Sequence, residues 1–131
     1  MSDDTQTCIG LMSGTSSDAI DAVLIEIADQ GRKVQVIATH SEPIEPTLQE
    51  KIRTVSSGED DRIDTVHALD TALAEQFAKA ANQVVEKTIR REDIAVIGSH
   101  GQTVRHRPEG PFPFSLQLGS GALIAARTGI T

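Results

Sequence analysis

A long stripe of apolar positions in the middle of the chain limits the folds that this sequence can adopt. Mostly apolar side chains recur there at steps of three and four residues, at Val66, Leu69, Leu73, Phe77, Ala80, Val84 and Thr88. This spacing places them on one face of a helix, so residues 66–88 are predicted to form a long amphipathic helix.

Three strand-like runs precede this helix. Residues 8–12 form a short apolar run, residues 21–28 are rich in valine, leucine and isoleucine, and residues 33–40 alternate polar and apolar side chains. Turn-forming residues separate these runs at 13–17 and at 30–31. The pattern predicts an antiparallel meander of three strands.

The rest of the chain indicates two shorter helices and an inner strand. A short helix is expected after Pro46, with Leu48, Ile52 and Val55 on one face. Residues 94–97 are fully apolar, which is typical of a central strand, and this strand is expected to end at the polar run 98–103. An exposed loop with three prolines, another strand and a short helix are then expected at residues 107–114, 115–118 and 122–127.

This order of elements predicts an α/β fold, a mixed sheet with helices. The same order recurs in the half-folds of actin-like proteins and sugar kinases, which are ribonuclease H-like, although a fold alone fixes no function. With 131 residues, the chain suits one domain.

Charge and cysteine content disfavour several classes of protein. A net charge of -7 disfavours a nucleic-acid partner and an anionic membrane surface, and no stretch approaches membrane-spanning length. The acidic start of the chain, from Met1 to Asp4, lacks the apolar stretch of a signal peptide. The single cysteine, Cys8, rules out an internal disulfide, is expected to be a small buried hydrophobe, and fits a reduced cytoplasmic setting.

The turn between the first two predicted strands contains the first group of residues that could bind a ligand. It combines glycines with hydroxyl side chains, at Gly10, Ser13, Gly14, Thr15 and Ser16. Glycines let the backbone approach a ligand, and hydroxyls and successive N–H groups can donate to phosphate oxygens. Asp18 and Asp21 could hold Mg²⁺, which prefers oxygen ligands and keeps several waters. A plain hairpin turn with an aspartate cap fits the same composition.

A second group follows the apolar run 94–97. Ligands gather at the strand ends of open sheets, and His100, Gln102 and Thr103 offer the donors and acceptors that suit sugar hydroxyls. A turn that carries a surface histidine is the alternative.

Common nucleotide-binding and hydrolase motifs are missing from both groups. A Walker loop needs Gly-Lys-Ser/Thr and a dinucleotide fold needs Gly-x-Gly-x-x-Gly, and neither occurs. A serine nucleophile elbow needs a glycine two residues before the serine, which neither Ser13 nor Ser99 has. No metal-ligand spacing is found among the histidines His40, His67, His100 and His106.

Several stretches of the chain resemble the signatures of the anhydro-N-acetylmuramic acid kinases. They are residues 9–24 (IGLMSGTSSDAIDAVL), 97–106 (IGSHGQTVRH), 116–119 (LQLG) and 125–131 (AARTGIT). Their order and spacing also agree with that family. The resemblance implies an ATP- and Mg²⁺-dependent enzyme that opens the 1,6-anhydro ring with water and phosphorylates O6. Its product would be N-acetylmuramic acid 6-phosphate, in peptidoglycan recycling in the bacterial cytoplasm.

The resemblance also implies roles for individual residues. The family's ATP-phosphate loop maps onto Gly14, Thr15, Ser16, Ser17, Asp18, Ala19, Ile20 and Asp21. The second signature would place His100, Gln102 and Thr103 near the sugar. ATP, Mg²⁺ and an amino sugar are therefore the expected ligands, with Asp18 and Asp21 at the metal, and neither nucleic acid nor a membrane is expected.

The chain departs from the family pattern within the loop and at its end. Ala19 stands where the family usually has glycine, and Ser17 where it usually has a larger apolar residue. Alanine would cost free energy if the backbone there needs a positive φ. Family members continue into a catalytic aspartate and a second domain. Residues 1–131 are thus expected to be a truncated N-terminal kinase domain that lacks the C-terminal domain and any catalytic residue, and is inactive alone.

Two alternatives remain open. A non-catalytic module derived from such a kinase would expose apolar surface and a sheet edge, which a homodimer or a complementing C-terminal half would cover. A sugar-binding domain that does not use ATP is the other alternative.

Overall fold

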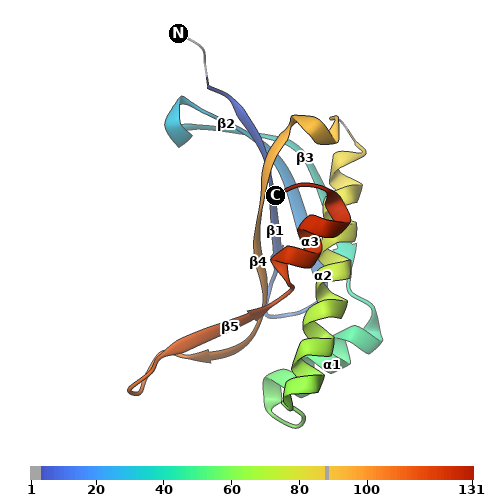
Figure 1. Cartoon of the computed structure of the whole chain (residues 1–131), viewed down its shortest axis with the longest axis vertical. Coiled ribbons are helices and arrows are strands. Elements are labelled where there is room, and N and C mark those ends of the chain that lie inside the picture. The colour runs from blue at the N-terminus through green and yellow to red at the C-terminus, as the bar shows by residue number, and fades with distance from the viewer. Residues whose placement is uncertain (1–3, 88) are drawn as a thin grey trace.

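A computed structural model describes residues 4–87 and 89–131 of the chain (Figure 1). The strands β1 (Gln6–Ser13), β2 (Ala19–Ala28) and β3 (Lys33–Pro43) come first, with a 3-10 turn, η1 (Asp29–Gly31), between the last two. The helices α1 (Pro46–Ser57) and α2 (Ile63–Val85) follow. A second 3-10 turn, η2 (Arg91–Asp93), then leads into β4 (Ile94–Arg107), β5 (Phe114–Leu118) and α3 (Gly121–Thr128).

The strands form one mixed sheet in the order β3-β2-β1-β4-β5. The first three strands are the predicted antiparallel meander, β4 runs parallel to β1, and β5 pairs antiparallel with β4. The predicted α/β class is confirmed, and the arrangement is consistent with an actin-like sugar-kinase half-fold.

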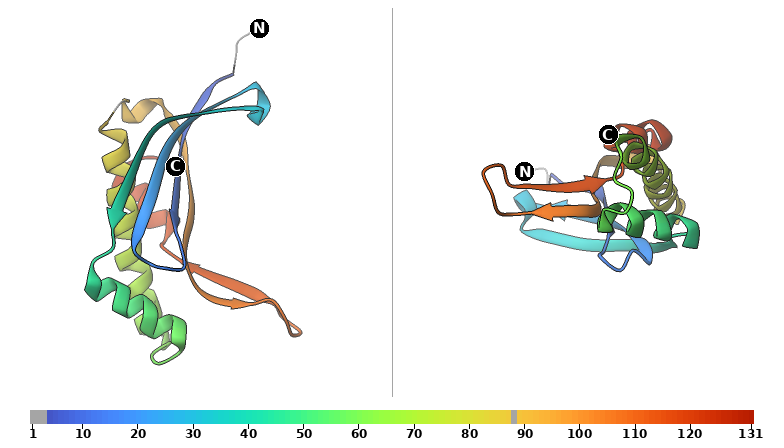
Figure 2. Two further views of the ribbon diagram at one scale, coloured as in Figure 1. Left: turned by 180° about the vertical axis from the view of Figure 1, so that it is seen from behind. Right: turned by 90° about the horizontal axis from the view of Figure 1, so that it is seen from below.

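The helices gather on one face of the sheet, as Figures 1 and 2 show from several sides. The core between the layers joins strand residues such as Ile9 and Leu24 to Phe77 of α2, each at most 1% exposed. The predicted helical stripe is confirmed, with Leu69, Leu73, Phe77, Ala80 and Val84 all buried. Thr88, the last residue of that stripe, lies outside the described residues. No helix in the described ranges is long and apolar enough to cross a membrane.

The short helices begin and end at residues suited to those positions. Pro46 occupies the first turn of α1, where its missing N–H costs nothing, and Gly58 ends the helix in the left-handed region. Ser120 caps α3 by accepting a hydrogen bond from the Leu123 amide, and Gly129 ends it. Residues 48, 52 and 55 of α1 are buried as predicted.

The expected end of the inner strand at residue 97 is wrong. Strand β4 continues from Ile94 to Arg107, so the polar run 98–103 lies inside a strand and not in a loop after it. The pairing with β1 shifts between Leu11 and Ser13, where two steps along β1 oppose three steps along β4. Gly101, with φ of +75°, lies in this irregularity and lets the strand continue through it.

Candidate functional site

The β1–β2 loop, residues 14–18, connects two neighbouring central strands at one end of the sheet. The Ser17 amide donates to the carbonyl oxygen of Gly14 at 3.1 Å and closes a four-residue turn. The amides of Thr15, Ser16 and Asp18 donate to no protein acceptor in the described part of the chain, and all three residues are exposed. Free, exposed amides on a tight turn are suited to binding an anion.

The other three residues of the predicted ATP-binding stretch belong to strand β2. Ala19 begins the strand, and Ile20 is fully buried in the core. Asp21 is exposed. Ala19 does not have a positive φ; among non-glycine residues of the described chain, Ser17, Asp29 and Gln30 do, and Ser17 has φ of 55°. The condition under which Ala19 would cost free energy is therefore not met, and the positive φ of this stretch lies at Ser17.

A buried hydrogen-bond network ties the start of the β1–β2 loop to β4. The Ser13 hydroxyl donates to Oε1 of Gln102 at 2.6 Å, and these residues are 3% and 1% exposed. Nε2 of Gln102 lies 3.3 Å from the carbonyl oxygens of both Gly14 and Thr103. Both the Ser13 hydroxyl and the Gln102 amide are thus engaged within the protein.

The three predicted sugar-binding residues lie in different environments along β4. His100 is exposed, and its Nδ1 lies 3.1 Å from the carbonyl oxygen of Gly101. Thr103 is half-buried, and its hydroxyl accepts a hydrogen bond from Gln117 of β5 at 3.2 Å. The structure therefore leaves His100 and Thr103 accessible to a ligand and buries Gln102.

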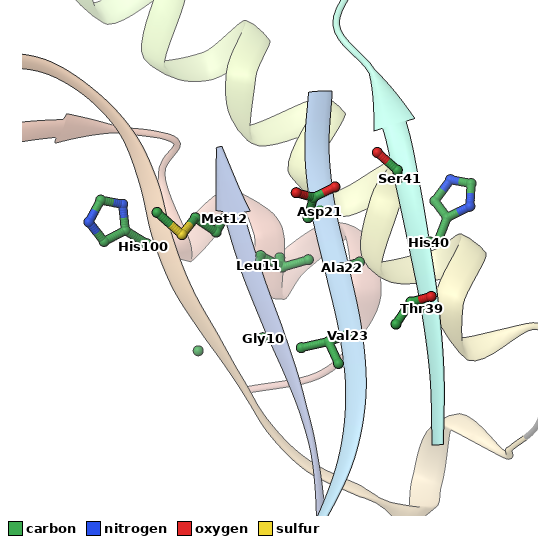
Figure 3. A pocket seen from close by; sticks show the side chains of 11 residues that line it. Gly10, Leu11, Met12, Asp21, Ala22, Val23, Thr39, His40, Ser41 and His100 are labelled. Carbon is green, nitrogen blue, oxygen red and sulfur yellow. The ribbon is translucent and has the colours of Figure 1, made fainter. Parts of the chain in front are cut away.

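A groove of about 530 Å³ on the face of the sheet away from the helices contains residues from both predicted groups (Figure 3). Asp21 of β2 and His100 of β4 line this groove. Gly10 and Gly98 lie opposite each other in β1 and β4, so no side chains fill its floor between these strands. The other lining residues are Leu11, Met12, Ala22, Val23, Thr39, His40 and Ser41.

A second hollow, of about 590 Å³, lies between the β1–β2 loop and α1, and the sequence analysis missed it. Thr15, Ser16 and Ser17 line it together with Arg53 of α1. Arg53 forms hydrogen-bonded ion pairs with Glu50 at 2.8 Å and Glu59 at 2.7 Å, which raise the pKa of its guanidinium. Two carboxylates thus balance its charge. The sequence pattern of α1 marked only its apolar face and gave no sign of this hollow.

Within the described chain, two carboxylates near the β1–β2 loop are free of the ion pairs that would compete with a magnesium ion. Asp18 and Asp21 are both exposed, and neither takes part in an ion pair among the residues that the structure describes. Residues 4–87 and 89–131 contain no group of three or more His, Cys, Asp or Glu side chains that could hold a metal ion. Mg²⁺ commonly binds proteins through one or two carboxylates, with phosphate and water as its other ligands.

Comparisons with known proteins match nearly the whole chain to one family. The family model described as anhydro-N-acetylmuramic acid kinase matches residues 6–131. Proteins of that name from Coxiella burnetii (strain Dugway 5J108-111) and Shewanella sp. (strain ANA-3) are 44% and 46% identical, over 94% and 93% of this chain. One from Colwellia psychrerythraea is 40% identical over 93% of it. The aligned parts make up 32%, 33% and 31% of these relatives, so the chain spans about a third of their length.

Proposed function

This chain belongs to the anhydro-N-acetylmuramic acid kinase family, and we propose that its β1–β2 loop holds the phosphates of ATP together with Mg²⁺. The observation that carries the proposal is that Thr15, Ser16 and Asp18 are exposed and that their amides donate to no acceptor among the described residues. Asp18 belongs to the same loop and Asp21 to the start of β2, and neither carboxylate takes part in an ion pair within residues 4–87 and 89–131. The amides would donate to phosphate oxygens, and the two carboxylates would hold a Mg²⁺ ion that neutralises phosphate charge.

In the proposed reaction, water adds to C1 of anhydro-N-acetylmuramic acid and breaks the C1–O6 bond of the 1,6-anhydro ring. The γ-phosphoryl group of ATP passes to O6, and ADP leaves. Phosphoryl transfer depends mainly on positioning and on neutralisation of charge. The loop amides would orient the phosphates, and Asp18 and Asp21 would place the metal that neutralises them. His100 and Thr103, which remain accessible on β4, would contact hydroxyls of the sugar.

We also propose that residues 1–131 act as the N-terminal domain of such a kinase, in peptidoglycan recycling in the bacterial cytoplasm. The relatives are about three times as long as the part that aligns with this chain. On this proposal, residues 1–131 supply the phosphate loop and part of the sugar site and do not complete the reaction by themselves. Closure of a second domain over the site would exclude water and align the reactants.

Substitution of the loop aspartate tests this function. Titration calorimetry should detect binding of ATP in the presence of Mg²⁺, and Asp18→Asn should weaken it about tenfold, because one charge-assisted contact is lost. The matched control is Asp29→Asn, in η1 at the opposite end of β2, which should leave the affinity unchanged. Equal affinities of the two variants for Mg-ATP would count against a phosphate site at the loop.

A partner-binding module is a second candidate, favoured by apolar side chains on the sheet face away from the helices. Met12 and Val96 are 51% and 41% exposed there. A homodimer or a complementing C-terminal half would cover them. Sedimentation equilibrium, together with the titration above, distinguishes the two candidates. A chain that associates as its concentration rises and binds no Mg-ATP supports the module. A monomer that binds Mg-ATP supports the kinase domain.

A further inference from the structure

The irregularity at Gly101 turns the side chain of Gln102 into the protein. Ile97 packs against the core, and strict alternation along β4 would direct residue 102 to the opposite face. The extra residue in β4 between its pairings with Leu11 and Ser13 reverses this alternation. Gln102 therefore lies opposite Ser13, at the end of β1, with its side chain buried.

The buried Gln102 amide is directed at the start of the β1–β2 loop. Its oxygen accepts from Ser13, the last residue of β1, and its nitrogen donates to Gly14, the first residue of the loop. The Gly14 carbonyl oxygen also accepts from the Ser17 amide and so closes the turn. One carbonyl group thus joins the turn to Gln102.

On the basis of the function proposed above for the loop, we propose that Gln102 is a positioning residue for phosphate binding. Its amide fixes Ser13 and the Gly14 carbonyl, and through them it holds the free amides of Thr15 and Ser16 in a set direction. A primary amide suits this role because it donates and accepts at once. Preorganised donors bind an anion more tightly than mobile ones, since less motion is lost on binding.

Two variants remove the network from opposite ends. Ser13→Ala deletes one buried hydroxyl, and Gln102→Leu replaces the buried amide with an apolar side chain. The matched control is Thr128→Val in α3. Thr128 is 2% exposed, and its hydroxyl donates to Ile124 at 2.8 Å and accepts from the Ile130 amide at 3.2 Å. This control removes a buried hydroxyl that has no contact with the loop.

The experiment measures backbone ¹⁵N order parameters of the full 131-residue chain without nucleotide, and then its dissociation constant for Mg-ATP. In both network variants, the order parameters at residues 15, 16 and 18 should fall from about 0.85 to below about 0.6. The dissociation constant should rise about tenfold, as expected when a buried hydrogen bond is lost. Thr128→Val should lower the melting temperature without either change.

The outcomes separate this proposal from the function on which it rests. Unchanged loop order parameters in both folded network variants would overturn the positioning role and make Gln102 a core residue only. Ser13→Ala, which removes a single oxygen atom, provides the test if Gln102→Leu does not fold. A wild-type chain that binds no Mg-ATP, but whose loop loosens in both variants, would contradict the phosphate site and still support control of the loop by Gln102.

Discussion

A Cβ atom on Gly101 would lie 2.6 Å from the carbonyl oxygen of Leu118 in the adjacent strand β5. The φ of +75° at Gly101 adds a second penalty for any residue with a side chain. Gly101→Ala is therefore predicted to lower the free energy of unfolding by about 3 kcal/mol, measured by urea denaturation. Loss of this irregularity in β4 would also move the Gln102 side chain away from Ser13 and Gly14.

Gly121 provides the matched control for this prediction. It begins α3 with an ordinary φ, and apart from its chain neighbours and the nearby helix backbone no described atom lies within 4 Å of the place where its Cβ would be. Gly121→Ala should change the free energy of unfolding by no more than about 0.5 kcal/mol, or raise it slightly. Equal losses at the two glycines would show that the close contact at Gly101 has no energetic effect.

The buried carboxylate of Glu42 predicts a pH dependence of stability. Lys79 lies 2.6 Å from it and His40 2.9 Å, and these hydrogen bonds, first that of Lys79, hold the pKa of Glu42 below its ordinary value of 4.5. Because the folded pKa is the lower one, this stability is fully present above pH 4.5. It is lost as the pH falls through the folded pKa.

Glu42→Gln should accordingly reduce the free energy of unfolding by about 1–2 kcal/mol at neutral pH. The difference from the wild type should shrink as the pH falls below 4.5, because the carboxylate is protonated first in the unfolded chain and, at lower pH, in the folded protein. Urea denaturation at several pH values measures both effects. Glu59→Gln, which alters an exposed ion pair with Arg53, should show no comparable loss. A difference at Glu42 that stays constant across this range would disagree with the prediction.

Backbone conformation predicts that substitution by glycine has different effects on stability at two nearby positions, Ser17 and Ala19. Ser17 has φ of 55°, so Ser17→Gly relieves backbone strain in the folded protein. It also raises the entropy of the unfolded chain, which acts in the opposite direction, so the free energy of unfolding should change by less than about 0.5 kcal/mol. Ala19 begins β2 without a positive φ, so Ala19→Gly should reduce the free energy of unfolding by about 1 kcal/mol. Thermal denaturation of both variants checks this order, and a larger loss at Ser17 would reverse it.

The sequence predicted the elements whose signals are local. The one-sided stripe of α2 repeats with the period of a helix, and the first three strands are separated by turn-forming residues. The β1–β2 loop was also evident, because Gly14, Thr15 and Ser16 favour a turn over a strand. The second strand was expected to begin at Asp21, whereas β2 begins at Ala19, so the last residues of the predicted ATP-phosphate stretch belong to the strand. Asp21 lines the groove.

The features that were missed depend on contacts between distant parts of the chain. Gly98 and Gly101 suggest a loop by composition, whereas pairing with β1 and β5 keeps residues 98–103 in a strand. The bond between Ser13 and Gln102 joins residues 89 positions apart, and no local pattern marks it. The sequence therefore indicated the residues around the site but could not show that Gln102 is buried.

Titration of the ¹⁵N-labelled chain with Mg-ATP, followed by NMR chemical shifts, tests the phosphate site most directly. We predict that the largest shift changes occur at the amides of Thr15, Ser16 and Asp18, and that they depend on Mg²⁺. Unchanged loop amides at millimolar Mg-ATP, or changes confined to a distant segment such as η1, would contradict the assignment of this loop to the phosphates of ATP.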